Sequence, residues 1–174
     1  MNDVLRVRDA TLADLSFLVE SNVAMALETE HRTLDRTLLE RGVAAVFAQP
    51  THGFYLVAEQ AGRPVGCLLI TYEWSDWRDG QWWWLQSVYV VPAARRSGVF
   101  RALHACIERR AAERSGVVGL RLYVESENRR AQSTYSELGM RQAAYVMFEV
   151  ALARVPLGFK PAQSGEDQPG EGDA

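Results

Sequence analysis

The sequence predicts a single α+β domain built on a mixed β-sheet. Runs rich in β-branched and aromatic residues, separated by turn signals, fill residues 54–91 and predict three antiparallel strands. Segments with a helical period of apolar residues flank these strands, and a later helical segment stands between two further strand-like runs. A helix between two strands typically joins parallel neighbours, so parallel and antiparallel pairs are expected in one sheet.

The first part of the chain is expected to form a strand and two helices. Residues 4–7 predict a short strand. Thr11 is a plausible helix N-cap, with Asp14 three residues later, and the helix is expected to continue to about residue 26. A polar stretch then interrupts the pattern, and a second helix is expected over residues 33–47.

The remaining elements follow in a regular order. Three strands form the antiparallel meander, at residues 54–59, 64–72 and 82–91. After Pro92 the pattern becomes helical and ends at Ser115-Gly116. A strand over 117–124, a helix over 128–138 and a final strand over 143–150 complete the order β-α-α-β-β-β-α-β-α-β.

Residues 1–155 are expected to form this domain, and residues 156–174 a disordered acidic tail. The tail is rich in Pro, Gly and acidic residues and has no periodic apolar pattern. The formal net charge of −3 comes entirely from it, because residues 1–155 carry 18 Arg against 18 Asp and Glu. A body without excess cations is unsuited to nucleic-acid phosphates, so no nucleic-acid partner is expected.

The composition also excludes other classes of protein. The two cysteines, Cys67 and Cys106, are too few for a disulfide framework or a zinc site, and no metal is expected. No apolar run reaches the ~18 residues that a membrane helix needs. The N-terminus lacks the apolar segment of a secretory signal. We therefore expect no membrane association and a cytoplasmic location.

The segment from Val90 to Arg101 carries the most informative chemical pattern. A strand passes directly into a helix through a turn that contains Gly98, Arg95 and Arg96. A helix N-terminus presents unpaired N–H groups and a positive dipole end, which favours an anion and above all phosphate. The nucleotide patterns GxxxxGK[ST] and GxGxxG are both absent. From this segment alone, an ordinary turn with solvated arginines is an equally good explanation.

Two motifs in the chain resemble those of the GNAT superfamily of N-acetyltransferases. The first, [QR]-x-x-G-x-[GA], reads RRSGVF over residues 95–100 and departs from the pattern at Phe100, which replaces a small residue. The second, N-x-x-A-x-x-x-Y-x-x-x-G-[FM], reads NRRAQSTYSELGM over residues 128–140. The order of elements from residue 4 to residue 150 is also similar to the GNAT fold.

The resemblance implies acetyl-CoA as co-substrate, held where two parallel strands of a GNAT-like mixed sheet splay apart. Backbone groups of the first of these strands are implied to bind the pantetheine arm, and N–H groups of the turn to bind the pyrophosphate. The implied co-substrate-binding residues are Val88, Tyr89, Val90, Arg95, Arg96, Ser97, Gly98, Val99, Phe100, Arg101, Asn128 and Ala131.

The resemblance implies that Tyr135 is the general acid that protonates the leaving thiolate. A phenol with a pKa near 10 is protonated at pH 7, and a thiolate near 8.5 is a modest leaving group that one donor can assist. The alternative for Tyr135 is a half-buried aromatic residue on a short helix. For Asn128 it is a helix N-cap, and both roles can hold together.

The acceptor amine needs a base, because an alkylammonium is free amine in only roughly one molecule in 10³ at pH 7. In the related polyamine acetyltransferases a glutamate commonly occupies the strand position that Gln86 holds here, and Gln86 cannot act as a base. A water held by Gln86 or by a backbone carbonyl could relay the proton. Glu28, Glu30 and His31 are further candidates between the first two helices, although a solvated loop explains them as well.

All five tryptophans lie between Trp74 and Trp84, on the hairpin that leads to the co-substrate strand. Trp77 and Trp84 are candidates for an aromatic wall around a cationic acceptor, together with Asp76. Core packing is an alternative for the tryptophans, a dimer contact is a third, and a self-bonded turn is the alternative for Asp76.

The sequence thus predicts an acetyl-CoA-dependent N-acetyltransferase that acts on a primary amine of a small molecule, by direct attack in a ternary complex. Acetylation of a protein or peptide amine is an alternative. A non-catalytic acyl-CoA-binding sensor is another, favoured by Gln86 and Phe100 and opposed by Tyr135. The sequence does not fix the oligomeric state, and the resemblance adds only that a homodimer is common in the family.

Overall fold

The computed structural model describes residues 4–150 and residue 152. Its first elements are the strand β1 (Arg6–Asp9) and the helices α1 (Leu15–Glu30) and α2 (Arg36–Ala48). The Thr11 N–H donates to the Asp14 carboxylate at 2.7 Å, so the predicted capping box stands at the start of the first helical segment.

Helix α1 is longer than the sequence predicted. It continues to Glu30 and ends at His31, whose backbone is left-handed with φ 53°. The expectation that Glu28 and Glu30 lie in an interhelical loop is therefore wrong, since both belong to the last turn of α1. The polar residues that suggested a break are tolerated because this end of the helix is exposed.

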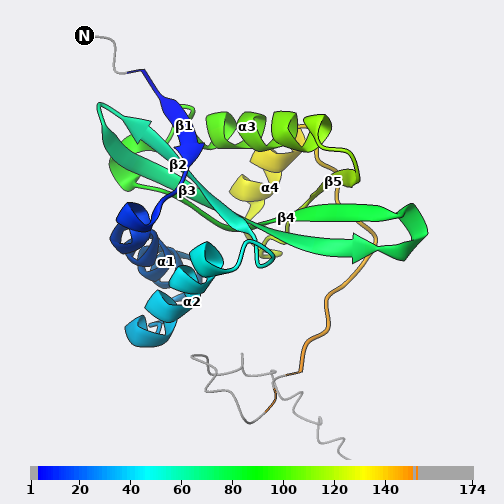
Figure 1. The fold of residues 1–174 in the computed structure, drawn as a ribbon, viewed down its shortest axis with the longest axis horizontal. Coiled ribbons are helices and arrows are strands. Elements are labelled where there is room, and N and C mark those ends of the chain that lie inside the picture. Colours follow the sequence, from blue (N-terminus) through cyan, green and yellow to red (C-terminus); the bar gives the residue numbers. More distant parts are fainter. Residues whose placement is uncertain (1–3, 151, 153–174) are drawn as a thin grey trace, which may run out of the picture.

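The predicted meander is confirmed as the antiparallel strands β2 (Phe54–Gln60), β3 (Arg63–Ser75) and β4 (Gly80–Val90). Strands β3 and β4 are longer than expected and join through a single short turn at Asp76–Arg78. Their hairpin extends beyond the rest of the sheet (Figure 1).

The second half of the chain forms the expected crossover. Helix α3 (Val99–Glu113) connects β4 to β5 (Val117–Arg121), and these two strands are parallel. Their pairing stops at Trp84 opposite Arg121, whereas β4 continues to Val90. The two strands therefore part after Trp84, and we call this place the fork.

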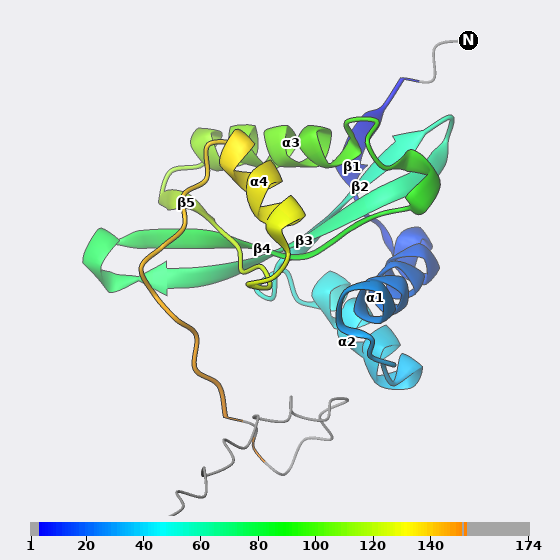
Figure 2. The ribbon, with the colours of Figure 1, turned by 180° about the vertical axis from the view of Figure 1, so that it is seen from behind.

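Helix α4 (Arg129–Glu137) follows β5 and lies beside α3 (Figure 2). No strand follows it in the described residues, so the expected strand over 143–150 is wrong. Residues 145–148 are apolar and favour an extended backbone, but a strand forms only where a partner accepts its hydrogen bonds, and here this segment stays exposed. The expected tail, 156–174, lies outside the described residues.

The sheet has the order β1-β2-β3-β4-β5 and separates two apolar clusters. One cluster joins α3 to the sheet through residues such as Leu68, Leu103 and Ile107. The other joins α1 and α2 to the opposite face through Leu18 and Val43. The two helical layers are seen above and below the sheet in Figure 1.

Two further properties concern all of the described residues. None of their helices combines the length and the apolar character that crossing a membrane requires. Within the same part of the chain, no group of three or more His, Cys, Asp or Glu side chains could hold a metal ion.

Candidate active site

The turn between β4 and α3 is shaped by two residues with left-handed backbones, Arg96 (φ 65°) and Gly98 (φ 87°). The first hydrogen bond of α3 runs from the Ala102 N–H to the Gly98 carbonyl at 2.9 Å. The N–H groups just before Ala102 therefore point out of the helix end with no acceptor inside it. Such a concave set of amides at a helix N-terminus is suited to bind a phosphate group.

The space beside Gly98 is open. A Cβ atom built on Gly98 meets no heavy atom within 4 Å, so the protein itself does not fill the approach to this turn. Val99, the next residue, is buried and fixes the first turn of α3 against the sheet. The side of the turn at Gly98 is thus open, while the opposite side is held by the core.

The three arginines of the turn have different surroundings. Arg95 turns toward α1, where its guanidinium lies 2.5 Å from the Glu28 carboxylate, and it also donates to the Val90 carbonyl at 2.9 Å. Arg101 is 4.0 Å from Glu137 of α4 and remains largely exposed. Arg96 is exposed as well. Arg96 and Arg101 are therefore the cations placed to meet an anion at the turn.

Glu28 contacts a residue of β4 as well as Arg95. The Tyr89 hydroxyl donates to its other carboxylate oxygen at 3.0 Å, while Arg95 lies 5.5 Å from the centre of the Tyr89 ring. Burial raises the pKa of Tyr89, and the neighbouring Glu28 carboxylate raises it further. The end of α1 is thereby tied to β4.

Backbone groups of β4 are available beyond the fork. A β-bulge lies there, since Leu68 pairs with Val88 but Ile70 pairs with Leu85, which leaves Gln86 and Ser87 opposite one residue of β3. Bulges re-aim side chains and are frequent near active sites. Among the described residues, none pairs with the segment from residue 85 to Val90 on its β5 side, so the backbone groups of alternate residues on that side face the fork.

Helix α4 brings the two residues of the second motif to the same side as α3. The Asn128 side chain accepts from the Ala131 N–H at 3.0 Å, so its N-cap role is confirmed. The Tyr135 ring meets the Phe100 ring edge-on, with centroids 5.7 Å apart. Burial raises the pKa of Tyr135, which keeps the phenol protonated at neutral pH. Its hydroxyl has no hydrogen-bond partner within the part of the chain that the structure describes.

A polar row crosses the sheet at Gln86. The Gln86 amide donates to the Thr71 hydroxyl at 3.0 Å, and its carbonyl accepts from the Tyr123 hydroxyl at 2.6 Å. Gln86 is thus fixed between β3 and the segment after β5. Burial raises the pKa of Tyr123, and the Glu30 carboxylate raises it further.

A second row, two residues along the same strands, contains Glu73, Trp84 and Arg121. The Trp84 indole N–H donates to Glu73 at 2.5 Å, and the Arg121 guanidinium donates to the other Glu73 oxygen at 2.7 Å. Arg121 also lies over the Trp82 ring, 4.1 Å from its centre. This ion pair spans β3 to β5 at the last residue pair before the fork, and we call it the fork clamp.

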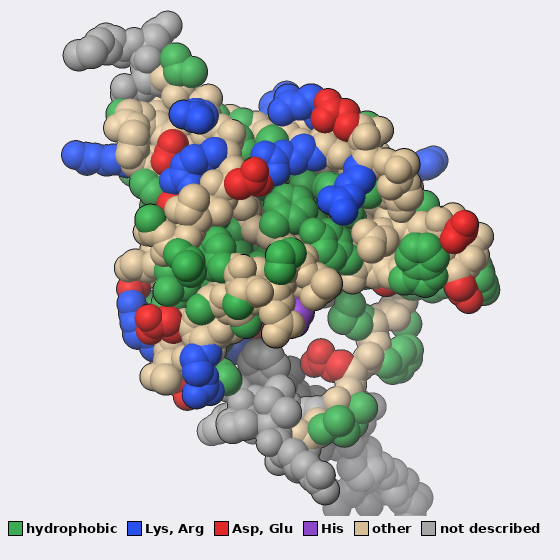
Figure 3. Space-filling view, in the orientation of Figure 1, with side chains coloured by type: hydrophobic (Ala, Val, Ile, Leu, Met, Phe, Trp, Pro, Cys, Tyr) green, Lys and Arg blue, Asp and Glu red, His purple; other side chains and the backbone are tan. Residues whose placement is uncertain are grey.

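The structure separates the tryptophans as strand alternation predicts. Trp83 is buried in the core, whereas Trp82 and Trp84 face the fork clamp. Trp74 and Trp77 are 61% and 86% exposed near the end of the hairpin, where hydrophobic side chains gather in Figure 3. Core packing therefore accounts for one of the five tryptophans, Trp83. Of the other four, only Trp84 is placed to form an aromatic wall near Gln86.

Asp76 and Trp77 are not brought to Gln86. The strand from Gly80 to Gln86 spans about 20 Å, and both residues lie beyond its far end. The Asp76 carboxylate accepts from the Trp77 N–H at 2.8 Å, as a turn residue does. The hairpin end is therefore a separate surface from the two polar rows.

The sequence analysis did not predict four residues of the two polar rows as candidate site residues. They are Thr71, Glu73, Arg121 and Tyr123. Thr71 and Glu73 alternate on β3 with the period of two that puts both on one face. That alternation predicts that the two side chains share a face of the sheet, but it does not predict the order of the strands in the sheet. The pairing of β4 with β5 decides that Arg121 reaches Glu73.

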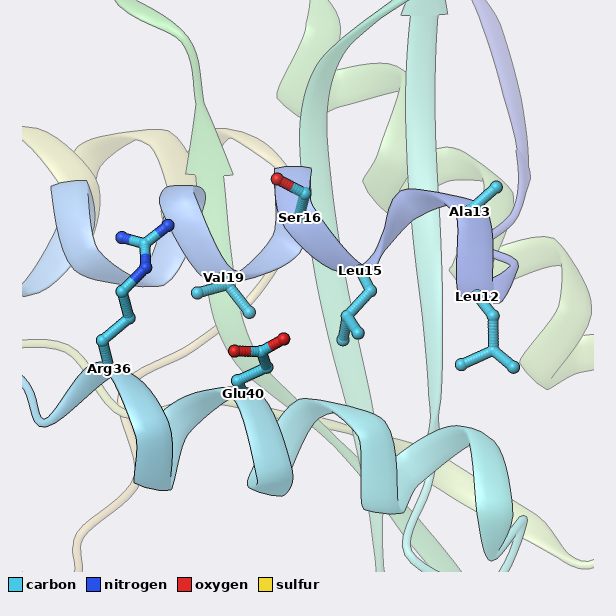
Figure 4. Close-up of a pocket in the computed structure, with 7 residues that line it drawn as sticks. All are labelled: Leu12, Ala13, Leu15, Ser16, Val19, Arg36 and Glu40. Atoms are coloured by element: carbon cyan, nitrogen blue, oxygen red, sulfur yellow. The ribbon is translucent and has the colours of Figure 1, made fainter.

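Two surface hollows lie away from these residues. One, of about 280 Å³, lies between the start of α1 and α2 and is lined by residues that include Leu15, Val19 and Glu40 (Figure 4). The other, of about 410 Å³, is lined by residues that include Phe54, Trp83 and Arg114. None of the site residues expected from the sequence lines either hollow.

Comparisons with known proteins agree with this architecture. The model of the acetyltransferase (GNAT) family matches residues 18–140. Among solved structures, a possible acetyltransferase from Clostridium difficile 630 is similar to the chain, with 38% sequence identity and a TM-score of 0.81. The match covers 86% of this chain and 98% of that one.

More distant structures share the fold. Aminoglycoside N-acetyltransferase AAC(6')-Iy in complex with CoA is 16% identical with a TM-score of 0.72, covering 87% of this chain and 97% of that one. Ribosomal-protein-alanine N-acetyltransferase from Brucella melitensis biovar Abortus 2308 is 15% identical with a TM-score of 0.68, covering 86% and 100%. A comparison with curated proteins gave no significant match. Since the family model spans well over half of the chain, the protein belongs to the GNAT family of acetyltransferases.

Proposed function

We propose that the protein transfers the acetyl group of acetyl-CoA to a primary amine of a small molecule, by direct attack within a ternary complex. The observation that carries this proposal is the arrangement of three parts on one side of the molecule. These parts are the fork between β4 and β5, the N-terminus of α3 and Tyr135 on α4. A strand edge open to a ligand, an anion site and an acid donor are the parts that acetyl transfer from a thioester requires.

The residues present fit acetyl-CoA. The open space at Gly98 and the free amides that follow it suit a pyrophosphate, with Arg96 and Arg101 adding charge. The edge of β4 at Val88 and Val90 lacks a strand partner in the described residues and suits the amide groups of a pantetheine arm, although the Val90 carbonyl already accepts from Arg95. The likeness to AAC(6')-Iy, which was solved with CoA, supports the same choice.

Tyr135 is the proton donor in this mechanism. Acetyl-CoA supplies a thioester whose acyl carbon accepts the amine and whose sulfur leaves as a thiolate. The Tyr135 phenol is protonated because burial raises its pKa, so it can give its proton to that sulfur. Its hydroxyl, with no competing hydrogen-bond partner in the described residues, is free to do so.

The amine side is assigned to the row at Gln86. Gln86 has no basic group, so in our proposal a water hydrogen-bonded to its amide relays the amine proton to bulk solvent, which is the final acceptor. The hydrogen bonds from Tyr123 and to Thr71 fix the orientation of that amide. Trp84, 5.8 Å from the Tyr123 ring, forms an aromatic wall beside it that favours a cationic amine.

A small-molecule acceptor is supported by the composition of this wall. Thr71 of β3 and Trp84 of β4 are partly buried beside Gln86, and Tyr123, which follows β5, is 58% exposed and closes the row. The likeness to an aminoglycoside acetyltransferase is compatible with such an acceptor. We further propose that residues 1–155 form the catalytic domain, that the enzyme acts in the cytoplasm and that it forms a homodimer.

The test is a panel of amines and peptides assayed by release of the CoA thiol, with wild-type protein and Tyr135→Phe. We expect the substitution to lower kcat about 10²-fold, since loss of an acid catalyst costs that order, while acetyl-CoA affinity stays nearly constant. Tyr145→Phe is the matched control, because Tyr145 is 82% exposed.

The outcomes separate the candidate functions. Turnover of small amines that depends on Tyr135 supports the proposal. Turnover of peptides alone assigns the protein-amine activity instead. Tight acetyl-CoA binding with no turnover on any amine identifies a sensor, and unchanged kcat in Tyr135→Phe removes Tyr135 from the mechanism.

A further inference from the structure

We propose that Phe100 is a positioning residue that holds Tyr135 in the orientation from which it donates its proton. This inference rests on the proposed function, because it assigns a role toward the acid of that reaction. It concerns the residue at which the first motif departs from its usual pattern. The contact between the Phe100 and Tyr135 rings, 5.7 Å apart at 74°, is the observation that carries it.

The position of the Phe100 ring is fixed by a contact within α3. Phe100 lies in the first turn of α3, and its ring also packs edge-on against His104, with centroids 6.1 Å apart. His104 is buried one turn further along the helix. The Phe100 ring is therefore held between the core-facing surface of α3 and the Tyr135 ring.

Helix α4 has little else to fix it. None of its residues is fully buried, in contrast to the six buried residues of α3. The ion pair from Arg101 to Glu137 spans 4.0 Å between side chains that are 73% and 63% exposed, and such pairs contribute little. An apolar contact at Tyr135 itself is a stronger constraint on this helix.

The Tyr135 hydroxyl cannot orient its own ring. No hydrogen bond to that hydroxyl is found in residues 4–150, so the direction of the phenol depends on packing around the ring. An aromatic edge contact restricts ring orientation because the positive edge of one ring seeks the negative face of the other. A glycine or alanine at position 100 has no side chain that could reach across to α4.

A double-mutant cycle tests the inference. The four proteins are the wild type, Phe100→Ala, Tyr135→Phe and the double variant, assayed for thiol release from acetyl-CoA with the best amine of the panel. If no amine serves, slow hydrolysis of acetyl-CoA by water replaces it, since that reaction also requires a proton on the thiolate. Phe100→Leu is the conservative variant, because it keeps apolar volume at the contact.

We expect Phe100→Ala to lower kcat roughly tenfold in the Tyr135 background, since small misplacements of a reacting group are costly. The KM for acetyl-CoA should change less than twofold, and Phe100→Leu should restore most of the lost kcat. On Tyr135→Phe the same change should have no further effect on kcat, because there is no acid left to position.

Phe54→Ala is the matched control. Phe54 also makes an edge-on aromatic contact, to Trp83 at 5.5 Å, on a different part of the sheet. It should lower the melting temperature without changing kcat. If Phe100→Ala fails to fold, Phe100→Val takes its place, because the shorter side chain also loses the contact with the Tyr135 ring. A kcat equal to wild type in folded Phe100→Val would overturn the inference.

The failures are distinguishable. If Tyr135→Phe is slow but Phe100→Ala lowers kcat equally in both backgrounds, Phe100 has a general structural role and our inference is wrong. If KM for acetyl-CoA rises and kcat does not fall, Phe100 acts on co-substrate binding instead. If Tyr135→Phe has full activity, the acid assignment in the proposed function fails first.

Discussion

At the scale of single residues, backbone conformation shapes the anion site. Arg96 occupies a left-handed conformation that a residue with a Cβ adopts only at a cost of about 1 kcal/mol. Gly98 adopts the same region without that cost. Two such residues close together turn the chain sharply enough to direct the free amides of α3 toward one point. The strain at Arg96 thus coincides with the proposed phosphate site.

Two substitutions of Gly98 distinguish the effect of backbone strain on stability from the effect of charge repulsion on acetyl-CoA binding. Gly98→Ala should lower the free energy of unfolding by about 1 kcal/mol, because the left-handed backbone is strained although its Cβ meets no atom. Gly98→Glu should have a similar effect on stability but abolish acetyl-CoA binding by charge repulsion with the pyrophosphate. Calorimetry of acetyl-CoA binding and chemical denaturation measure the two effects.

Gly62 provides the control for that comparison. It has φ 71° in the turn between β2 and β3, and a Cβ there also meets no atom. Gly62→Glu should therefore show the same strain with normal acetyl-CoA affinity. Retained binding in Gly98→Glu would exclude this turn as the phosphate site.

At the scale of elements, two features define the fork between β4 and β5. One lies in β4 beyond the last residue pair with β5, and the other joins the strands just before that point. The bulge at Gln86 bends β4 beyond the last β5 pair, and the fork clamp fixes the strands just before it. Gly119 contributes on β5, since a Cβ there would lie 2.5 Å from the Trp82 ring. The close approach of that ring to β5 is what lets Arg121 stack on it.

The fork clamp predicts a measurable coupling between Glu73 and Arg121. A double-mutant cycle with Glu73→Gln and Arg121→Gln should give a coupling of about 0.5–1 kcal/mol in the free energy of unfolding, because both side chains are only partly buried. The coupling should shrink in 1 M salt. The exposed pair of Glu20 and Arg36 should show almost none, and equal coupling in both pairs would argue against a special role for the clamp.

At the scale of the whole molecule, one partly buried network joins the N-terminal strand β1 to β2 and to the start of the first helix. The Arg8 guanidinium donates two hydrogen bonds to Asp14, at 2.7 and 2.8 Å, and two to Glu59 on β2, at 2.6 and 2.8 Å. Asp14 is only 5% exposed. The hydrogen bonds from Arg8 are the main cause that lowers the pKa of Asp14 below its usual value.

The network predicts how stability depends on pH. A carboxylate whose pKa is lower in the folded than in the unfolded protein contributes stability above the unfolded pKa, and this is lost as the pH falls below about 4. Asp14→Asn should lower the free energy of unfolding by roughly 2 kcal/mol at pH 7 and flatten its decline in acid. Denaturation curves between pH 7 and pH 3 measure this.

Asp9→Asn is the matched control for the acid prediction. Asp9 also pairs with an arginine, Arg110, at 2.5 Å, but its side chain is 66% exposed. Its loss should change stability by less than about 1 kcal/mol. An unchanged acid profile in Asp14→Asn would show that another carboxylate governs acid unfolding.

Much of the fold could be predicted because its signals are local. The capping box at Thr11, the alternation that buries Trp83 and the helix that begins at Gly98 each depend on residues a few positions apart. The second motif likewise located α4 and its N-cap Asn128. The end of α1 was misplaced because exposed polar residues are compatible with either a helix or a loop.

The sequence by itself determined the order of elements up to α4, the turn before α3 and the two motifs that indicate the family. Tertiary structure alone decided that Arg95 pairs with Glu28, that Arg121 reaches Glu73 and that Phe100 meets Tyr135. It also left residues 143–150 without a strand partner. The physical reason is the separation along the sequence. Periodicity and capping depend on residues a few positions apart, whereas these contacts depend on strand order, register and the packing of separate helices.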